Sequence, residues 1–315
     1  MKKGPKSINS EEIKTIPLDE RPSKVSTKDF GKPYEKGNSF KDFLNTLPAI
    51  LAAKDIKEVA HQVVNAHRNK KPVIFGMGAH VVKVGLNPLI IDLMQRGIIS
   101  CIAMNGAGAI HDVEIALAGK TSEDVSASLK RGEFGMAGDA ANIINQAVKT
   151  GADNNWGMGE AIGKELLQLS APYTEMSLLA RACKNGIPLT VHVGIGTDTI
   201  HMHPSFDGAA TGKLSHLDFK KFSSLVAQLE GGVFFNIGSA VIIPEVFLKA
   251  LSLATNLGGK KINLTTVNMD FIRHYRPSVN VVQRPTTASN GKGYHLIGHH
   301  EIMLPLLSAA ILEEL

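Results

Sequence analysis

Apolar positions along this chain form two kinds of pattern that alternate in order. Short runs of branched apolar residues, typical of strands buried on both faces, occupy 72–78, 98–104, 187–193, 232–238 and 262–269. Elsewhere apolar residues recur at helical spacing, over 40–47, 56–64, 87–96, 140–148, 160–169, 174–184, 217–229 and 302–315. This alternation predicts an α/β fold with a Rossmann-like, mostly parallel sheet and helices on both faces, in a single large domain.

Two parts of the chain lack this regularity. Residues 1–36 hold several prolines and many charges, so we expect an extended or disordered N-terminal arm, followed by the α/β domain over 37–315. The arm is either a loose terminus or a segment that docks on a partner subunit. Residues 120–160 are rich in glycine turns, with a loop expected over 151–159. They would form either a lid over a site or a surface excursion.

The stretch 187–203 combines a buried strand with a cluster of polar residues. The strand breaks into a Gly-x-Gly turn at Gly194 and Gly196, and Asp198, His201 and His203 follow within a few residues. Open α/β sheets build their sites in this way, at the carboxyl ends of the strands. Since other strands end in similar turns, we expect these turns to share one cleft.

Four such turns follow a strand and precede a helix. Glycine lets backbone N–H groups approach a ligand, and a helix N-terminus favours anions, so NAD is the natural ligand. No turn carries the complete Gly-x-Gly-x-x-Gly pattern with a later acid, and the alternative is tight turns only. The candidate cofactor-binding residues are Gly76, Gly78, Asn105, Gly106, Gly108, Gly238 and Ser239.

Histidines and one lysine are further candidates for chemistry. His201 and His203 form a His-x-His pair, and His299 and His300 lie near the C-terminus. Core histidines are the expectation, with no metal site, although a metal-dependent hydrolase remains an alternative. Lys292 lies in Asn-Gly-Lys-Gly, which predicts a flexible turn. A lysine forms imines only when burial or a nearby cation lowers its pKa.

The bulk composition narrows the classes of protein. The net charge is only +5, which argues against a nucleic-acid partner. No apolar run reaches the roughly 20 residues of a membrane span. Cys101 and Cys183 are expected to be reduced thiols, so we expect a soluble cytoplasmic protein.

The order of these motifs resembles the deoxyhypusine synthase family over about residues 70–312. The family's first strand and glycine turn are similar to Val73-Ile-Phe-Gly-Met-Gly, and its glycine turn with paired acids is similar to 105–112. Its Asp-rich turn with a following histidine is similar to 193–203. Its Arg-Pro and Gly-Lys resemble Arg284-Pro285 and Gly291-Lys292, and its ending resembles Pro305-Leu306-Leu307.

The resemblance implies a Rossmann-like homotetramer with sites between subunits. It implies that bound NAD takes a hydride from spermidine and that Lys292 captures the aminobutyl fragment as an imine before a protein lysine accepts it. Asp112, Asp198 and His203 would then contact the polyamine.

The chain departs from the family at three places. The turn with the family's catalytic histidine is Gly238-Ser-Ala-Val-Ile-Ile-Pro-Glu245 here, which makes Glu245 a candidate replacement base. The acidic NAD segment is replaced by residues 270–276, and no tryptophan precedes Lys292. A non-catalytic nucleotide-binding relative is therefore the alternative to an aminobutyl transferase.

Overall fold

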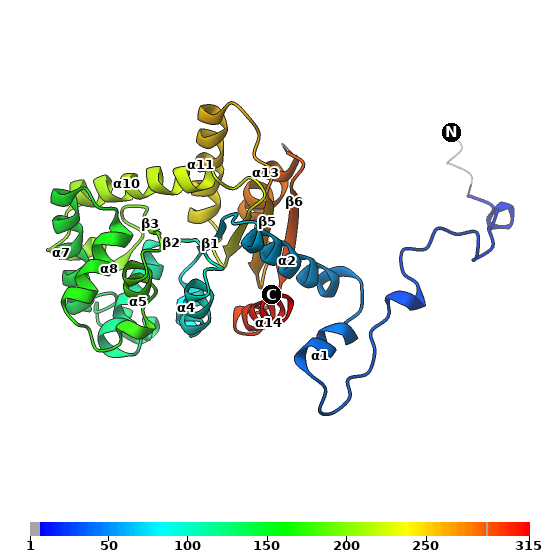
Figure 1. Ribbon diagram of the computed structural model, residues 1–315, viewed down its shortest axis with the longest axis horizontal. Coiled ribbons are helices and arrows are strands. Elements are labelled where there is room, and N and C mark those ends of the chain that lie inside the picture. Colours follow the sequence, from blue (N-terminus) through cyan, green and yellow to red (C-terminus); the bar gives the residue numbers. More distant parts are fainter. Residues whose placement is uncertain (1–6, 288) are drawn as a thin grey trace, which may run out of the picture.

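A computed structural model of the protein describes residues 7–287 and 289–315 (Figure 1). Its strands form one parallel sheet in the order β3-β2-β1-β4-β5-β6, which confirms the predicted Rossmann-like α/β fold. From β1 the strands β2 and β3 are added to one side of the sheet, whereas β4, β5 and β6 are added to the other side. The strand order thus changes direction between β1 and β4, and sheets of this kind bind their ligands at that point. The strands are β1 (Val73–Met77), β2 (Cys101–Asn105), β3 (Leu189–His192), β4 (Val233–Ile237), β5 (Thr265–Asp270) and β6 (Lys292–Ile297).

Helices cover both faces of the sheet, as the sequence predicts. Alternate residues of β1 enter different cores: Val73, Phe75 and Met77 join one, and Ile74 joins the other with Phe234 and Phe247. The second face carries α10 (Gly208–Val226) and α11 (Ile242–Gly258), above the sheet in Figure 1. The first core includes residues of α2 (Leu51–Arg68), α4 (Asn87–Gln95), α5 (Gly106–Ala118), α7 (Gly138–Asn154), α8 (Met158–Gln168), α9 (Leu178–Lys184) and α14 (His300–Glu314).

Shorter elements connect these layers. They are α1 (Phe40–Thr46), α3 (His80–Lys83), α6 (Val125–Lys130), α12 (Tyr275–Pro277), α13 (Arg284–Thr287), the 3-10 turns η1 (Ser10–Glu12), η2 (Thr27–Asp29), η3 (Thr174–Met176) and η4 (Thr199–Met202), and the π-helix η5 (Ser278–Gln283). Near the C-terminus, α14 lies against α2, and Nη2 of Arg68 donates to the carbonyl oxygens of Glu314 at 2.9 Å and Leu315 at 3.1 Å.

Three sequence-based expectations about local structure are wrong. The loop expected over 151–159 is largely helical, since α7 runs through Gly151 and α8 begins at Met158. Gly151 is a packing position and not a turn, because a Cβ there would lie 2.7 Å from Ala161 and 2.8 Å from Leu214. The expected helix over 174–184 is interrupted at Ser177, whose hydroxyl accepts from the N–H of Ala180 and caps α9. The turn expected around Lys292 is the start of the unpredicted strand β6.

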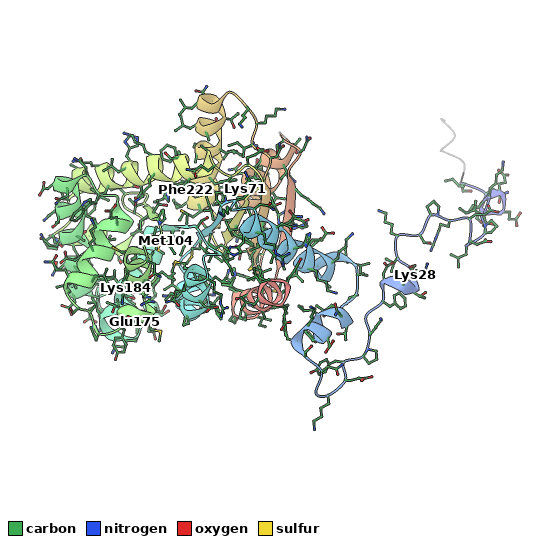
Figure 2. All side chains as sticks on the ribbon, in the orientation of Figure 1. Lys28, Lys71, Met104, Glu175, Lys184 and Phe222 are labelled. Atoms are coloured by element: carbon green, nitrogen blue, oxygen red, sulfur yellow. The ribbon has the colours of Figure 1, made fainter. Side chains whose placement is uncertain are left out.

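The described part of the arm extends away from the body of the protein (Figure 1). Ile8 is 93% exposed and Leu18 is 73% exposed, and Lys28 stands apart from the body in Figure 2. The arm meets the α/β domain where the N–H of Ala49 donates to Asp29 O at 3.0 Å and the N–H of Lys32 donates to Thr46 O at 2.8 Å. Among the described residues, no helix combines the length and apolarity needed to span a membrane.

Candidate functional site

A cavity of about 250 Å³ lies among the segments that follow β1, β2 and β3. Its walls come from the end of α3, the first turns of α5, the segment 122–134 and the residues between β3 and η4. Three carboxylates face it, with one lysine and one histidine. The lining residues are Lys83, Ala107, Ile110, His111, Glu114, Ser122, Glu123, Val125, Phe134, Thr197, Asp198 and Thr199.

Asp198 lies at the N-terminus of α5. A Cβ on Gly106 would be 2.1 Å from Oδ2 of Asp198, so only glycine leaves room for this carboxylate. The N–H of Ala107 donates to the carboxylate, and burial raises its pKa to about 6. Oδ2 has no hydrogen-bond partner within the described chain. A buried acid in a cavity wall with an oxygen that lacks a partner is a candidate for ligand binding or proton transfer.

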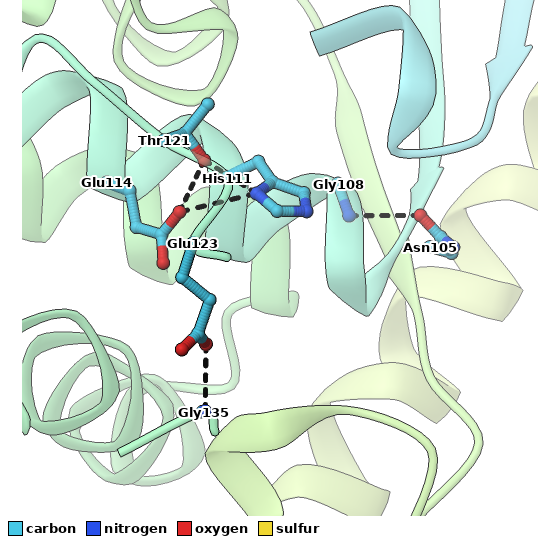
Figure 3. A network of polar contacts seen from close by, with 7 residues as sticks. All are labelled: Asn105, Gly108, His111, Glu114, Thr121, Glu123 and Gly135. Atoms are coloured by element: carbon cyan, nitrogen blue, oxygen red, sulfur yellow. Dashed lines mark hydrogen bonds and ion pairs between the residues drawn. The ribbon is translucent and has the colours of Figure 1, made fainter. Parts of the chain in front are cut away.

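A polar network holds Glu114 at the other side of the cavity (Figure 3). Nδ1 of His111 lies 2.6 Å from Thr121 Oγ1 and 3.3 Å from Glu114 Oε2, and the Thr121 hydroxyl donates to the same carboxylate oxygen. Burial raises the pKa of Glu114, but the hydrogen bonds from His111 and Thr121 outweigh it and leave the pKa below its usual range. Glu114 is therefore a fixed negative charge.

Gly135 anchors the segment 122–134, which forms part of the cavity wall. Its N–H donates to Glu123 Oε1 at 2.8 Å (Figure 3). Its carbonyl accepts from Nε2 of His203 at 2.8 Å. Gly135 has a φ of +74°, and a Cβ there would lie 2.6 Å from the Thr199 side chain. His203, predicted to bind substrate, thus holds a segment that lines the cavity.

Asp112 lies on the opposite face of α5 and does not line the cavity. It is fully buried, and burial raises its pKa. Its oxygens accept from Asn87 Nδ2 at 2.9 Å, Ser177 Oγ at 2.6 Å and the N–H groups of Leu178 at 2.7 Å and Leu179 at 3.0 Å. These bonds hold the N-terminus of α9 against α5.

A second candidate region lies between β1 and β4, where the strand order changes direction. The N–H of Gly78 donates to Ile237 O at 2.9 Å, and the N–H of Gly238 donates to Met269 O at 2.9 Å, so the turns after β1 and β4 extend the ladder. Ser239 Oγ accepts from the N–H of Ile243 at 3.2 Å in the first turn of α11. Gly76 has a packing role, since a Cβ there would lie 2.6 Å from Ile243.

His300 is a buried residue that the sequence reading did not assign to this region. Its Nε2 lies 2.6 Å from the place that a Cβ on Gly238 would take, and 3.9 Å from Asp270 Oδ1. Neither ring nitrogen has a hydrogen-bond partner in the described part of the chain, and burial lowers the pKa. A histidine shortly after a strand would indicate such a site, but the sequence pattern does not reveal β6, the strand that precedes His300.

Lys292 lies at the amino-terminal ends of the strands, opposite the ends that lead to the cavity. It begins β6 and pairs in register with Thr265, the first residue of β5. Asp270 and Ile297 lie at the carboxyl ends of these two strands. The length of the strand places its carboxyl end about 16 Å from Lys292. Lys292 is exposed and forms an ion pair with Glu58, and that hydrogen bond raises its pKa. Within one chain, therefore, the expected shared cleft does not include Lys292.

Glu245 lies in the first turn of α11 and outside the cavity. It forms ion pairs with Lys249 and with Arg276, the latter at 3.4 Å, and accepts from Asn280 Nδ2 at 2.9 Å. The hydrogen bond from Lys249 is the main reason that its pKa lies below the usual range. Its role as a base stays a prediction.

The histidine pair is not arranged as metal ligands. Nδ1 of His201 accepts from the N–H groups of Gly196 at 3.0 Å and Asp198 at 3.3 Å, whereas His203 bonds to Gly135. In residues 7–287 and 289–315 no group of three or more His, Cys, Asp or Glu side chains is placed to hold a metal ion.

Comparisons with known proteins relate the fold to NAD-linked and deoxyhypusine synthase-like proteins. No family model matches the chain, and no curated protein matches its sequence. A conserved protein assigned to the LOR/SDH class from Methanococcus maripaludis S2 is similar in structure, with a TM-score of 0.53, 18% identity and coverage of 83% of this chain and 70% of that one. AgrE in ternary complex with ornithine and NAD+ has a TM-score of 0.55 at 13% identity over 84% of this chain and 33% of AgrE.

A protein assigned as a deoxyhypusine synthase from Entamoeba histolytica has a TM-score of 0.50 at 10% identity, over 90% of this chain and 96% of that one. At such identities these likenesses show the fold alone. The chain thus has a dehydrogenase-like or deoxyhypusine synthase-like fold. Membership of the deoxyhypusine synthase family stays a prediction.

Proposed function

We propose that the protein is an NAD-dependent enzyme that oxidises a cationic amine. In its specific form it transfers an aminobutyl group from spermidine or a related polyamine to an amine acceptor, through an imine on Lys292. The observation that carries the proposal is the cavity with Asp198, Glu114 and Glu123 in its walls, at the carboxyl side of a Rossmann-like sheet. Three carboxylates in a partly enclosed site favour a ligand with several ammonium groups.

The region around Gly238 fits the dinucleotide better than the N-terminus of α5. At α5 the carboxylate of Asp198 already accepts from the Ala107 N–H, so a phosphate there would meet a negative charge. At the reversal point, Gly238 and Ser239 lead into the 17-residue helix α11, and β5 ends in Asp270. This strand–turn–helix–strand–acid order matches a dinucleotide-binding unit, in which the acid binds ribose hydroxyls. Cofactor roles for Asn105, Gly106 and Gly108 are therefore not part of the proposal.

Bound NAD+ would supply the hydride acceptor, and the cavity residues would hold the amine. Glu114 and Glu123 are fixed by Thr121, His111 and the Gly135 N–H, so they keep their positions when an ammonium group enters. Such charge-assisted hydrogen bonds are about twice as strong as neutral ones. The segment anchored at Gly135 would exclude water from the bound amine.

Lys292 can act in this reaction only if a second chain brings it to the cavity. It lies at the opposite edge of its own sheet, and its exposed amine is paired with Glu58. A homotetramer with sites between subunits would provide that arrangement, and the extended arm offers contact surface for it. A subunit interface would also displace water around the amine and favour its neutral form. The acceptor would be a small amine or a protein lysine.

A second candidate function follows from Lys83. This residue lines the cavity and makes no ion pair within the described residues, so it offers a cation for a ligand carboxylate. Two ammonium groups and one carboxylate would suit this set of charges, which favours NAD-dependent oxidation of a basic amino acid. AgrE, which shares the fold, has been crystallised with ornithine and NAD+.

The test is NADH formation with a panel of amines. Spermidine, putrescine, ornithine and lysine are each incubated with the protein and NAD+, and the absorbance of NADH is followed. Glu123→Gln should raise KM about tenfold, because one charge-assisted contact is lost. Glu175→Gln, an exposed residue distant from the cavity, is the matched control.

The outcomes separate the candidates. Lys83→Gln should raise KM for ornithine and leave spermidine unchanged if the ligand carries a carboxylate. Borohydride trapping of an aminobutyl adduct on Lys292 would support the transferase. NAD binding without turnover of any amine would refute both and leave a nucleotide-binding relative.

A further inference from the structure

Oxidation of an ammonium substrate requires a base. A protonated nitrogen has no lone pair with which to expel a hydride from the neighbouring carbon, so the proton must leave first. The chain has no histidine in the first turn of α11, and Glu245 there is held at a lowered pKa by Lys249. The identity of this base rests on the proposed function, since only oxidation of an ammonium substrate requires it.

We propose that Oδ2 of Asp198 accepts the proton from the substrate ammonium group in the cavity. Of the three cavity carboxylates, Glu114 is held by Thr121 and His111, and Glu123 accepts from the Gly135 N–H. Asp198 Oδ2 alone among them is both buried and without a partner in the described part of the chain. An unpartnered buried oxygen is costly unless a ligand meets it, and Asp198 is one of the residues that line the cavity.

The surroundings of Asp198 place its oxygen without neutralising its charge. From α5 the N–H of Ala107 donates to it, and Gly106 allows the close approach. From η4, His201 uses Nδ1 to accept from the N–H of Asp198, so its ring is neutral and donates nothing to the carboxylate. The same cavity is also lined by His111 and Glu114 of α5, Glu123 of the segment 122–134 and Lys83 of α3.

Burial raises the pKa of Asp198 to about 6, so the group is ionised at neutral pH and still basic enough to accept a proton. A pKa near the working pH is the property expected of a general base.

One N–H bond of the ammonium group breaks, and an O–H bond forms at Oδ2 of Asp198. The electron pair of the broken bond stays on nitrogen and forms the C=N bond as hydride leaves the adjacent carbon for the nicotinamide dinucleotide. The organic product is an iminium ion, and Asp198 returns its proton to water afterwards. Glu114 and Glu123 hold the remaining ammonium groups and transfer no proton.

The experiment is a pH profile of kcat/KM for wild-type protein and two variants, each with NAD+ and the amine that gives NADH. The wild-type profile should fall below about pH 6, and Asp198→Asn should lower kcat by about 100- to 10,000-fold and remove that acidic limb. Glu123→Gln should raise KM and keep the limb. NAD affinity, measured by calorimetry, should be the same in all three.

A second measurement guards against an unfolded variant. The side-chain carbon of Asp198, followed by ¹³C NMR in wild-type protein, should titrate near pH 6, and a saturating diamine should lower that midpoint. Titration near pH 4, or an acidic limb that persists in Asp198→Asn, would overturn the assignment and leave amine oxidation intact. A wild-type protein that oxidises no amine would refute the proposed function, and the base with it.

Discussion

Gly78 and Gly238 approach each other so closely that a Cβ on Gly78 would lie 2.2 Å from the carbonyl oxygen of Gly238. The contact joins the turns after β1 and β4, where the sheet reverses its direction of growth. Two backbones meet there with no side chain between them. The contact explains why Gly78 must be glycine before any ligand is considered, whereas Gly238 needs glycine because its φ is +66° and a Cβ there would lie 2.6 Å from Nε2 of His300.

The first prediction concerns this contact. Gly78→Ala should lower the free energy of unfolding by about 2–3 kcal/mol, because the obstructing atom belongs to the backbone and must shift. Gly212→Ala, in α10 with nothing within 4 Å of its Cβ, should instead raise stability by up to about 1 kcal/mol. Urea unfolding measures both. Equal stability of the two variants would show that the turns separate easily.

The second prediction separates a structural acid from a binding one. Asp112→Ala should destabilise the protein by at least about 3 kcal/mol, because four buried donors lose their acceptor. Asp92→Ala, which removes an exposed pair with Arg96, should change stability by less than about 1 kcal/mol. Thermal unfolding measures both changes. A folded Asp112→Ala protein that has lost only amine affinity would restore the substrate-binding role.

A third prediction concerns Asp218, which is fully buried in α10. Burial raises its pKa to about 7, although the N–H groups of Val191 and Gly159 donate to it. The unfolded value is about 3.9, so between these values the folded protein keeps a proton that the unfolded chain releases. This contribution is complete below about pH 4 and is lost as the pH rises through about 7.

Asp218→Asn should therefore flatten the decline in stability between pH 4 and pH 7, because the amide oxygen can still accept both N–H groups. Urea unfolding at several pH values measures the slope. The effect is at most about 4 kcal/mol, from a shift of about three pKa units. Identical slopes in the variant and the wild-type protein would mean that other groups control the pH dependence.

The fourth prediction follows from the separation of Lys292 and Asp198 within one chain. If the transferase reaction uses both, they come from different subunits. Lys292→Ala and Asp198→Asn should each be inactive, and co-refolded mixtures of the two should regain about a quarter of wild-type activity, since random assembly leaves that share of composite sites intact. Light scattering should show a mass four times that of the chain. An inactive mixed tetramer would exclude Lys292 or the composite site.

The outline of the fold was predictable because buried parallel strands and amphipathic helices leave distinct periodicities. β6 was missed because exposed and buried positions mix along it and its Gly-Lys-Gly start resembles a turn. Asp198 was predictable from its place after a strand. Asp112 and His111 are adjacent in sequence, but α5 turns by about 100° per residue, so one faces α9 and the other faces the cavity.

Glu123 could not have been assigned from its local sequence. It lies in the irregular segment before α6, and its proximity to Asp198 depends on the hydrogen bond to Gly135, twelve residues away. The position of Lys292 in the cleft is an expectation from the resemblance to the deoxyhypusine synthase family. The register of β6 against β5 places it elsewhere, and register is a property of strand pairing.

The contact between α14 and α2 has a consequence for synthesis on the ribosome. The buried face of α2 is covered by a helix that begins more than two hundred residues later, at His300. Until that helix emerges, Val59 and Val63 lack part of their apolar cover, and β4 must meanwhile insert beside β1 across a long intervening segment. Contacts between such distant segments form slowly. We therefore expect the nascent chain to expose apolar surface for much of its translation, a state that chaperones bind.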